Sequence, residues 1–98
     1  MPQPNDVTVR HDTAAHRFEI AVEGHIAFLE YDRADRDVTI LHTEVPAALS
    51  GRGLGNLLAK TALEWARGEH LHVVVLCPFV REYLRKHPLP PEHPDSVA

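Results

Sequence analysis

Glycine is concentrated at one point of this chain. Three of its five glycines lie in the pentapeptide Gly51-Arg52-Gly53-Leu54-Gly55, between an apolar run that ends at Val45 and an amphipathic run that begins at Leu54. We therefore expect a strand, a glycine loop and a helix in that order. Glycines let the backbone approach a ligand, and the first turn of a helix adds unpaired N–H donors and a partial positive charge. This arrangement favours an anion, phosphate above all, at the loop.

Two well-known glycine motifs do not fit this loop. The dinucleotide fingerprint G-x-G-x-x-G needs a third glycine where Asn56 stands, and the P-loop needs Gly-Lys followed by Ser or Thr. A plain strand-to-helix turn stays open as an alternative, because such turns often contain glycine. Arg52 favours the binding interpretation, since a guanidinium can form forked hydrogen bonds with phosphate oxygens.

Length and charge narrow the class of protein. A chain of 98 residues, 44% of them hydrophobic, can bury one core but is too short for two domains, so we expect a single domain over 1–98. A net charge of −4 with scattered Lys and Arg disfavours nucleic acid as a partner. The longest apolar run, Val73 to Cys77, suits a buried strand and not a membrane span. The single cysteine and the polar N-terminus predict a cytoplasmic protein.

The hydrophobic pattern predicts an α/β (α+β) domain. Alternation predicts four antiparallel strands over Val7–Arg10, Arg17–Val22, His25–Tyr31 and Val38–Val45, with the polar stretch 11–16 and the charged stretch 32–37 as connections. Helical spacing predicts a helix from Leu54 to about Gly68, with Leu58, Ala62 and Trp65 on its apolar side. A strand over His72–Leu76 then follows, parallel to its neighbour.

Proline marks the last elements. Pro78 suits the first position of a second helix, which we expect to reach about His87. Pro88, Pro90, Pro91 and Pro94 exclude regular structure beyond it, so 88–98 is expected to be a flexible tail.

The stretch from His42 to His87 resembles the GNAT superfamily of N-acetyltransferases, whose signature Q/R-x-x-G-x-G/A binds the pyrophosphate of acetyl-CoA. Gly53 and Gly55 take the two glycine positions, and Ser50 stands where the superfamily usually has Gln or Arg. From Val7 to Pro88 the chain is also similar to a group of very small acetyltransferases of about one hundred residues. Their pattern of a His-x-Glu-Val-Pro strand end, a glycine loop, a helix, a Val-rich strand and Cys-Pro is matched by His42 to Pro78.

The resemblance implies a minimal GNAT-like fold that uses acetyl-CoA or CoA as co-substrate. In that fold two parallel strands splay apart and hold the pantetheine arm, and here they would be Val38–Val45 and His72–Leu76. The residues implied to bind the cofactor are Val45, Ser50, Gly51, Arg52, Gly53, Leu54, Gly55 and Asn56. No metal is expected, because His70 and His72 lack a third ligand at suitable spacing.

Four residues are candidates for catalysis. Cys77 precedes Pro78, so it would cap the second helix, where the dipole favours a nucleophilic thiolate; the alternative is a small buried apolar residue. His42 and Glu44 share one face of a strand and could both take a proton at one site, near Cys77. A purely structural histidine is the alternative for His42. Tyr83 resembles the tyrosine that often protonates the departing CoA thiolate, and a core tyrosine is equally compatible with the sequence.

The expected activity is acyl transfer from acetyl-CoA to an amine, and the transfer is either direct or through an acetylated Cys77. Only the short stretch 11–16 joins the first two strands, where larger relatives have a helical pair, so the acceptor side should be open. A protein lysine, or a site completed by a second subunit, suits such a surface, and we expect a monomer or weak dimer. The alternatives are a non-catalytic module that binds CoA or acyl-CoA and, last, a purely structural interaction domain.

Overall fold

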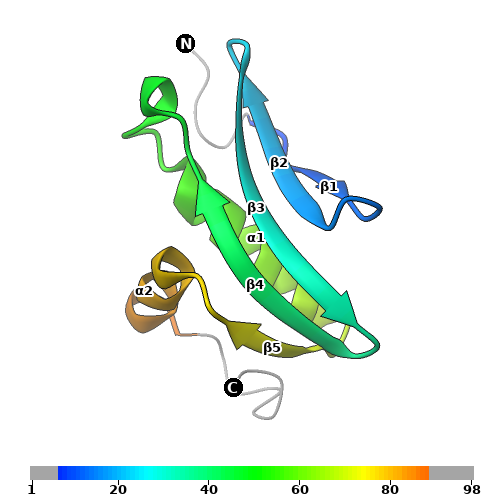
Figure 1. The fold of residues 1–98 in the computed structure, drawn as a ribbon. Coiled ribbons are helices and arrows are strands. Elements are labelled where there is room, and N and C mark those ends of the chain that lie inside the picture. The colour runs from blue at the N-terminus through cyan, green and yellow to red at the C-terminus, as the bar shows by residue number, and fades with distance from the viewer. Residues whose placement is uncertain (1–6, 89–98) are drawn as a thin grey trace.

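The computed structural model describes residues 7–88. A five-stranded sheet in the order β1-β2-β3-β4-β5 carries two helices (Figure 1). The strands are β1 (Arg10–Asp12), β2 (Arg17–Val22), β3 (His25–Ala34), β4 (Asp37–Glu44) and β5 (His72–Val75). The helices are α1 (Leu54–Gly68) and α2 (Pro78–Lys86), and the short 3-10 helix η2 (Ala47–Leu49) lies between β4 and α1.

The pairing of the strands confirms the expected α/β architecture. Strands β1 to β4 pair with their neighbours in antiparallel fashion, and β5 pairs with β4 in parallel. A parallel neighbour requires a crossover, which α1 provides. The glycine loop, its helix, the parallel strand and the final helix follow one another as the sequence indicates.

Two connections differ from the sequence-based expectation. The first strand is Arg10–Asp12 and not Val7–Arg10, so part of the stretch 11–16 assigned to a turn is strand. His11 belongs to this strand because its ring stacks on Phe18, with the ring centroids 3.9 Å apart. The charged stretch 32–37 is also mostly strand, since β3 runs to Ala34 and β4 begins at Asp37. Charged side chains at the end of a hairpin reach water and do not oppose pairing.

The other boundaries agree closely. Strand β4 ends at Glu44, one residue before the expected end, and β5 ends at Val75, one residue early. Helix α2 ends at Lys86, and His87 is its C-cap. The proposed tail, except for Pro88, lies outside the described residues.

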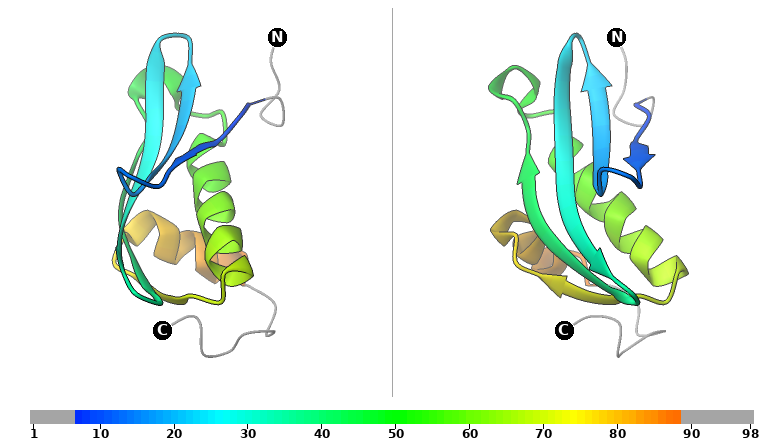
Figure 2. Two further views of the ribbon diagram at one scale, coloured as in Figure 1. Left: turned by 90° about the vertical axis from the view of Figure 1, so that its right-hand side faces the viewer. Right: turned by 45° about the vertical axis from the view of Figure 1, so that its right-hand side comes forward.

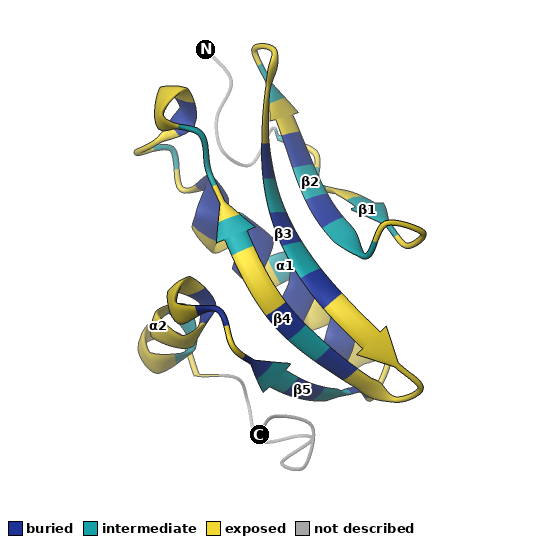
Figure 3. Cartoon of the chain, in the orientation of Figure 1, coloured by how far each residue is buried: buried dark blue, intermediate teal, exposed yellow. Residues whose placement is uncertain are grey.

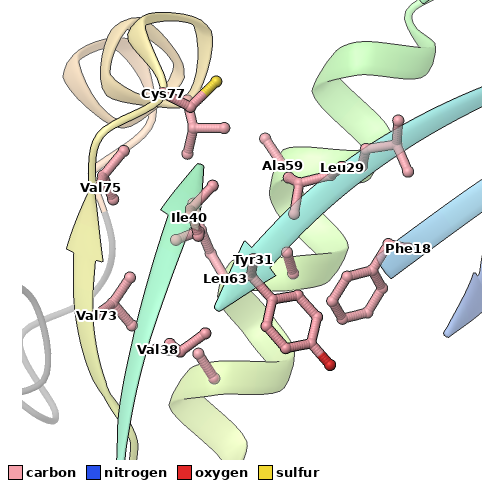
Figure 4. Packing of buried hydrophobic residues seen from close by; sticks show 14 of the residues in the cluster. Phe18, Leu29, Tyr31, Val38, Ile40, Ala59, Leu63, Val73, Val75 and Cys77 are labelled. Atoms are coloured by element: carbon pink, nitrogen blue, oxygen red, sulfur yellow. The ribbon is translucent and has the colours of Figure 1, made fainter. Parts of the chain in front are cut away.

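Both helices lie on one face of the sheet, and no described element covers the other face (Figure 2). The core fills the space between this face and the helices, and dark buried segments alternate along the strands (Figure 3). Large residues that are fully buried there are Phe18, Ile20, Leu29, Ile40, Leu58 and Leu63. Figure 4 shows several of them between the strands and α1. Alternating burial therefore gives each strand an inner and an outer set of side chains.

Aromatic rings gather at the C-terminal half of α1. Trp65 of α1 lies edge-on to His11 and to Phe18, with ring centroids 4.8 Å and 5.6 Å away. The Nε2 atom of His11 lies 2.7 Å from the hydroxyl of Tyr31, so one of the two groups donates to the other. Ring packing and a hydrogen bond together hold the short edge strand β1 against the core.

Candidate functional site

The glycine loop joins η2 to α1. Gly51 and Gly53 have φ of 80° and 75°, in the left-handed region that favours glycine, and an added Cβ at either position would meet no atom within 4 Å. The N–H of Ser50 donates to the carbonyl of Ala47, and that of Leu57 donates to Gly53. In the described part of the chain, the N–H groups from 51 to 56 make no such bond. These donors are therefore not used up by main-chain bonds within residues 7–88, which anion binding at the loop would require.

These donors are not equally accessible. Gly51, Gly53 and Asn56 are exposed, whereas Leu54 and Gly55 are buried. A Cβ added at Gly55 would lie 2.7 Å from the ring of Phe79 in α2. The third glycine thus makes room for α2 against α1. Packing against Phe79 is therefore one reason for a glycine at this position, and the expected role of Gly55 in binding a ligand stays a prediction.

Arg52 is engaged in the structure. Its two terminal nitrogens donate to the two carboxylate oxygens of Glu23, at 3.3 Å and 3.2 Å. The hydrogen bond and the positive charge of Arg52 lower the pKa of Glu23 below its ordinary value. Glu23 lies in the turn between β2 and β3, so this ion pair connects that hairpin to the glycine loop.

The expected fork between β4 and β5 is present. Their pairing ends at Ile40↔Val75, and the N–H groups of Leu76 and Cys77 both donate to the carbonyl of Ile40, at 2.9 Å and 3.1 Å. Beyond this point β5 turns away toward α2, as Figure 1 shows, while β4 continues to Glu44 beside β3. One edge of β4 therefore faces no strand of the described sheet beyond Ile40.

Three exposed apolar residues stand close to the fork in the sequence. Leu41 lies on β4 just past Ile40, and Leu76 follows the last residue of β5. Both are exposed, as is Phe79 in the first turn of α2. Three of the four large hydrophobic residues that are exposed in residues 7–88 thus lie close to the fork in the chain.

His42 and Glu44 lie together on the outer face of the sheet. The Nε2 atom of His42 is 3.2 Å from the carboxylate of Glu44, and both side chains are exposed. The residue between them, Thr43, pairs with Leu29, which is buried beneath the helices. Because side chains alternate along a strand, His42 and Glu44 point away from α1 and α2.

Cys77 lies on the inner side. It caps α2, as expected, and only 2% of it is exposed. Its thiol donates to the hydroxyl of Thr43 at 3.5 Å. No contact joins Cys77 to His42 or Glu44 in the described chain, so the expected cluster of three is divided between the two faces of the sheet. The sequence-based prediction did not include Thr43, although alternation places neighbouring residues such as His42 and Thr43 on opposite faces of the strand.

The remaining candidates have mixed surroundings. Tyr83 is half-buried, its ring stacks on His87 with centroids 4.5 Å apart, and burial and Glu64 raise the pKa of its hydroxyl. Within residues 7–88, no hydrogen bond or ring contact joins Tyr83 to Cys77. The hydroxyl of Ser50 donates to Ala47 at 2.9 Å. Val45 packs against the core just after β4.

Three further features of the described structure bear on other kinds of site. A hollow of about 610 Å³ lies beside the β2–β3 hairpin. Glu23, which is paired with Arg52 of the glycine loop, is one of its lining residues, and Cys77 is not. Within residues 7–88, no group of three or more potential metal ligands is assembled. None of the helices described is long and apolar enough to cross a membrane.

The loop, the fork and the sheet order together correspond to a known family. Residues 17–92 match the family model described as GCN5-related N-acetyl-transferase. The chain belongs to this family. The resemblance noted in the sequence is confirmed, and family and fold support an acetyltransferase-type function.

Individual relatives agree with this assignment. Protein NATD1 of Mus musculus is 34% identical over 93 residues, which are 92% of this chain and 84% of that protein. Protein NATD1 of Homo sapiens is 36% identical over 87 residues, with 86% and 77% covered. The solution NMR structure of a GCN5-like protein from Staphylococcus aureus superposes with a TM-score of 0.67 at 26% identity, covering 93% of this chain and 87% of that one.

Proposed function

We propose that this protein transfers an acyl group, acetyl above all, from CoA to an amine. The observation that carries the proposal is the fork at Ile40, which opens on the same sheet that leads into a glycine loop with free N–H donors. A diphosphate matches these donors and the positive end of α1. The exposed apolar residues Leu41, Leu76 and Phe79 suit the pantetheine arm.

The candidate catalytic residues lie on two faces of the sheet, and each face suggests a different role. On the outer face, the carboxylate of Glu44 orients the imidazole of His42, which can accept a proton from an attacking ammonium group. On the inner face, Thr43 fixes the thiol of Cys77 beside the fork. The half-buried hydroxyl of Tyr83 keeps its proton at neutral pH, which suits a proton donor to a departing thiolate. The acyl donor on the inner face and the amine acceptor on the outer face would thus come into contact at the fork.

The acceptor that fits best is an amine carried by a protein. The outer face is uncovered in the described structure, and β1 and β2 are joined only by a short turn. An enclosed pocket for a small amine would need walls that these elements do not provide. A lysine on an extended or flexible segment can reach such an open face.

Titration calorimetry tests the first requirement. CoA should bind the wild-type protein, and the absence of binding at millimolar CoA would contradict the proposal. His42→Ala should then reduce transfer to a lysine peptide by about a hundredfold, the usual contribution of a general base, while CoA affinity stays unchanged. Ala14→Gly, in the exposed turn before β2, is a matched control that should leave both quantities unchanged.

The role of Cys77 has its own test. Mass spectrometry of the intact protein after incubation with acetyl-CoA should reveal one added acetyl group if transfer passes through the thiol, and Cys77→Ala should abolish it. An unmodified protein that still acetylates the peptide establishes direct transfer.

A second candidate is a module that binds CoA or acyl-CoA without catalysis. The burial of Cys77 and its separation from His42 favour this alternative. It predicts CoA binding in the wild type with no transfer to any acceptor, and no effect of His42→Ala. A screen of acylated acceptors with acetyl-CoA distinguishes the two.

A further inference from the structure

Glu23 and Arg52 form an ion pair across 29 positions of the chain. Both terminal nitrogens of the guanidinium are used, each with its own carboxylate oxygen, at 3.3 Å and 3.2 Å. This is the fork geometry in which arginine also binds phosphate. The side chain expected to meet a phosphate is therefore occupied by an anion that the protein itself provides.

The turn that carries Glu23 does not require a glutamate. Glu23 and Gly24 have φ of 51° and 80°, and they are the two central residues of a tight hairpin between Val22 and His25. Asn, Asp and Gly are the residues preferred where such turns need a positive φ. The longer side chain is explained by its contact with Arg52 and not by the backbone of the turn.

The ion pair is suited to exchange. The side chains of Arg52 and Glu23 are 39% and 59% exposed, so water and salt weaken their attraction. A glutamate is charged at neutral pH, and its hydrogen bond with Arg52 and the charge of Arg52 lower the pKa of Glu23 further. The contact is therefore present at rest but weak enough for a stronger anion to displace it.

We propose that Glu23 is an internal competitor that sets the affinity of the glycine loop for phosphate-bearing ligands. It holds Arg52 in the absence of ligand, and it must release Arg52 when a diphosphate takes the same nitrogens. Glu23 thereby weakens the binding of CoA and of acyl-CoA by the same factor and favours product release. The inference rests on the proposed function for its natural ligand, but its chemistry concerns any diphosphate at the loop.

The test measures affinity at low salt with two probes, CoA and inorganic pyrophosphate. Glu23→Gln should bind both about two- to fivefold more tightly than the wild type, the range expected for the loss of an exposed ion pair. Glu69→Gln is the matched control, because it removes the same charge just beyond the far end of α1 and should leave both affinities unchanged. Pantetheine, which carries no phosphate, should show no gain with Glu23→Gln.

A double variant shows whether Arg52 carries the effect. In an Arg52→Gln background the gain from Glu23→Gln should disappear, since no cation is left to release. Unchanged or weaker binding by Glu23→Gln, or an equal gain in the Arg52→Gln background, would overturn the inference. If pyrophosphate binding follows these expectations while CoA does not bind, the proposed function fails and the competitor role stands. If neither probe binds any variant, both fail.

Discussion

The two ends of α1 lie in opposite kinds of surroundings. At the C-terminal half, Trp65 is enclosed by the rings of His11, Phe18 and Tyr31, and the polar atoms of His11 and Tyr31 satisfy each other. At the N-terminus, the N–H groups of the loop before the helix have no main-chain partner in the described chain. The nearby side chain of Phe79 is exposed. The comparison teaches that, at the C-terminal half of this helix, rings and polar groups satisfy one another, whereas main-chain N–H groups at the N-terminus are left without a main-chain partner in residues 7–88.

The largest expected effect is a difference in the free energy of unfolding lost on mutation at the two ends of α1. Phe18→Ala removes a buried ring and should lower the free energy of unfolding by about 3–5 kcal/mol. Phe79→Ala removes a ring of the same size that is 43% exposed, and should cost less than about 1 kcal/mol. Urea unfolding measures both. If Phe18→Ala does not fold, Phe18→Leu gives the milder comparison. An equal loss of unfolding free energy at the two positions would contradict the difference between the two ends of α1.

A smaller effect is expected from the backbone of the loop. Gly53→Ala forces a side chain into the left-handed region and should destabilise by about 1–2 kcal/mol. Gly68→Ala, at the other end of the same helix, has an ordinary φ and open space around the added methyl group. It should be neutral or stabilising by up to about 1 kcal/mol. Thermal unfolding of the two variants measures both changes. A loss of stability in Gly68→Ala as large as that in Gly53→Ala would contradict the role given to the left-handed φ of Gly53.

The smallest effect concerns pH at the enclosed end. Burial lowers the pKa of His11 below its usual 6.5, so the folded state favours the neutral ring. Its contribution to stability is therefore fully present above pH 6.5 and is lost as the pH falls through the lowered pKa. Urea unfolding of the wild type between pH 7.5 and about 5 should show this decline, and His11→Asn should reduce it. Tyr31→Phe should cost about 1 kcal/mol at neutral pH and retain the decline. The same decline in His11→Asn would exclude this histidine as its source.

Much of the fold follows from local patterns. The helical spacing of Leu58 and Ala62 predicted α1, and the β-branched run at Val73 predicted β5 with its parallel pairing. Strand β1 could not be predicted in the same way, because His11 is polar in the sequence and packs beside the core only through its contact with Phe18. That contact depends on tertiary packing, which alternation over a few residues does not encode.

The candidate site was predictable to the extent that its residues are close in sequence. The left-handed glycines, the fork and the cap at Cys77 follow from local pattern and family resemblance. The partners of Arg52 and Gly55 did not follow, since Glu23 and Phe79 are distant in the chain. Cys77 was expected near His42 because both are near strand ends. The register of the β3–β4 pairing shifts between Glu30 and Tyr31, however, so that Thr43 and not His42 shares the inner face with the thiol.

Two of the hydrogen bonds at the fork share a single main-chain oxygen. The carbonyl of Ile40 accepts from two consecutive N–H groups, and neither bond involves a side chain. Replacing the residues that follow β5 with any amino acid except proline leaves both donors in place. A lineage can therefore exchange the cysteine for another residue at this position while the point where β4 and β5 part stays the same.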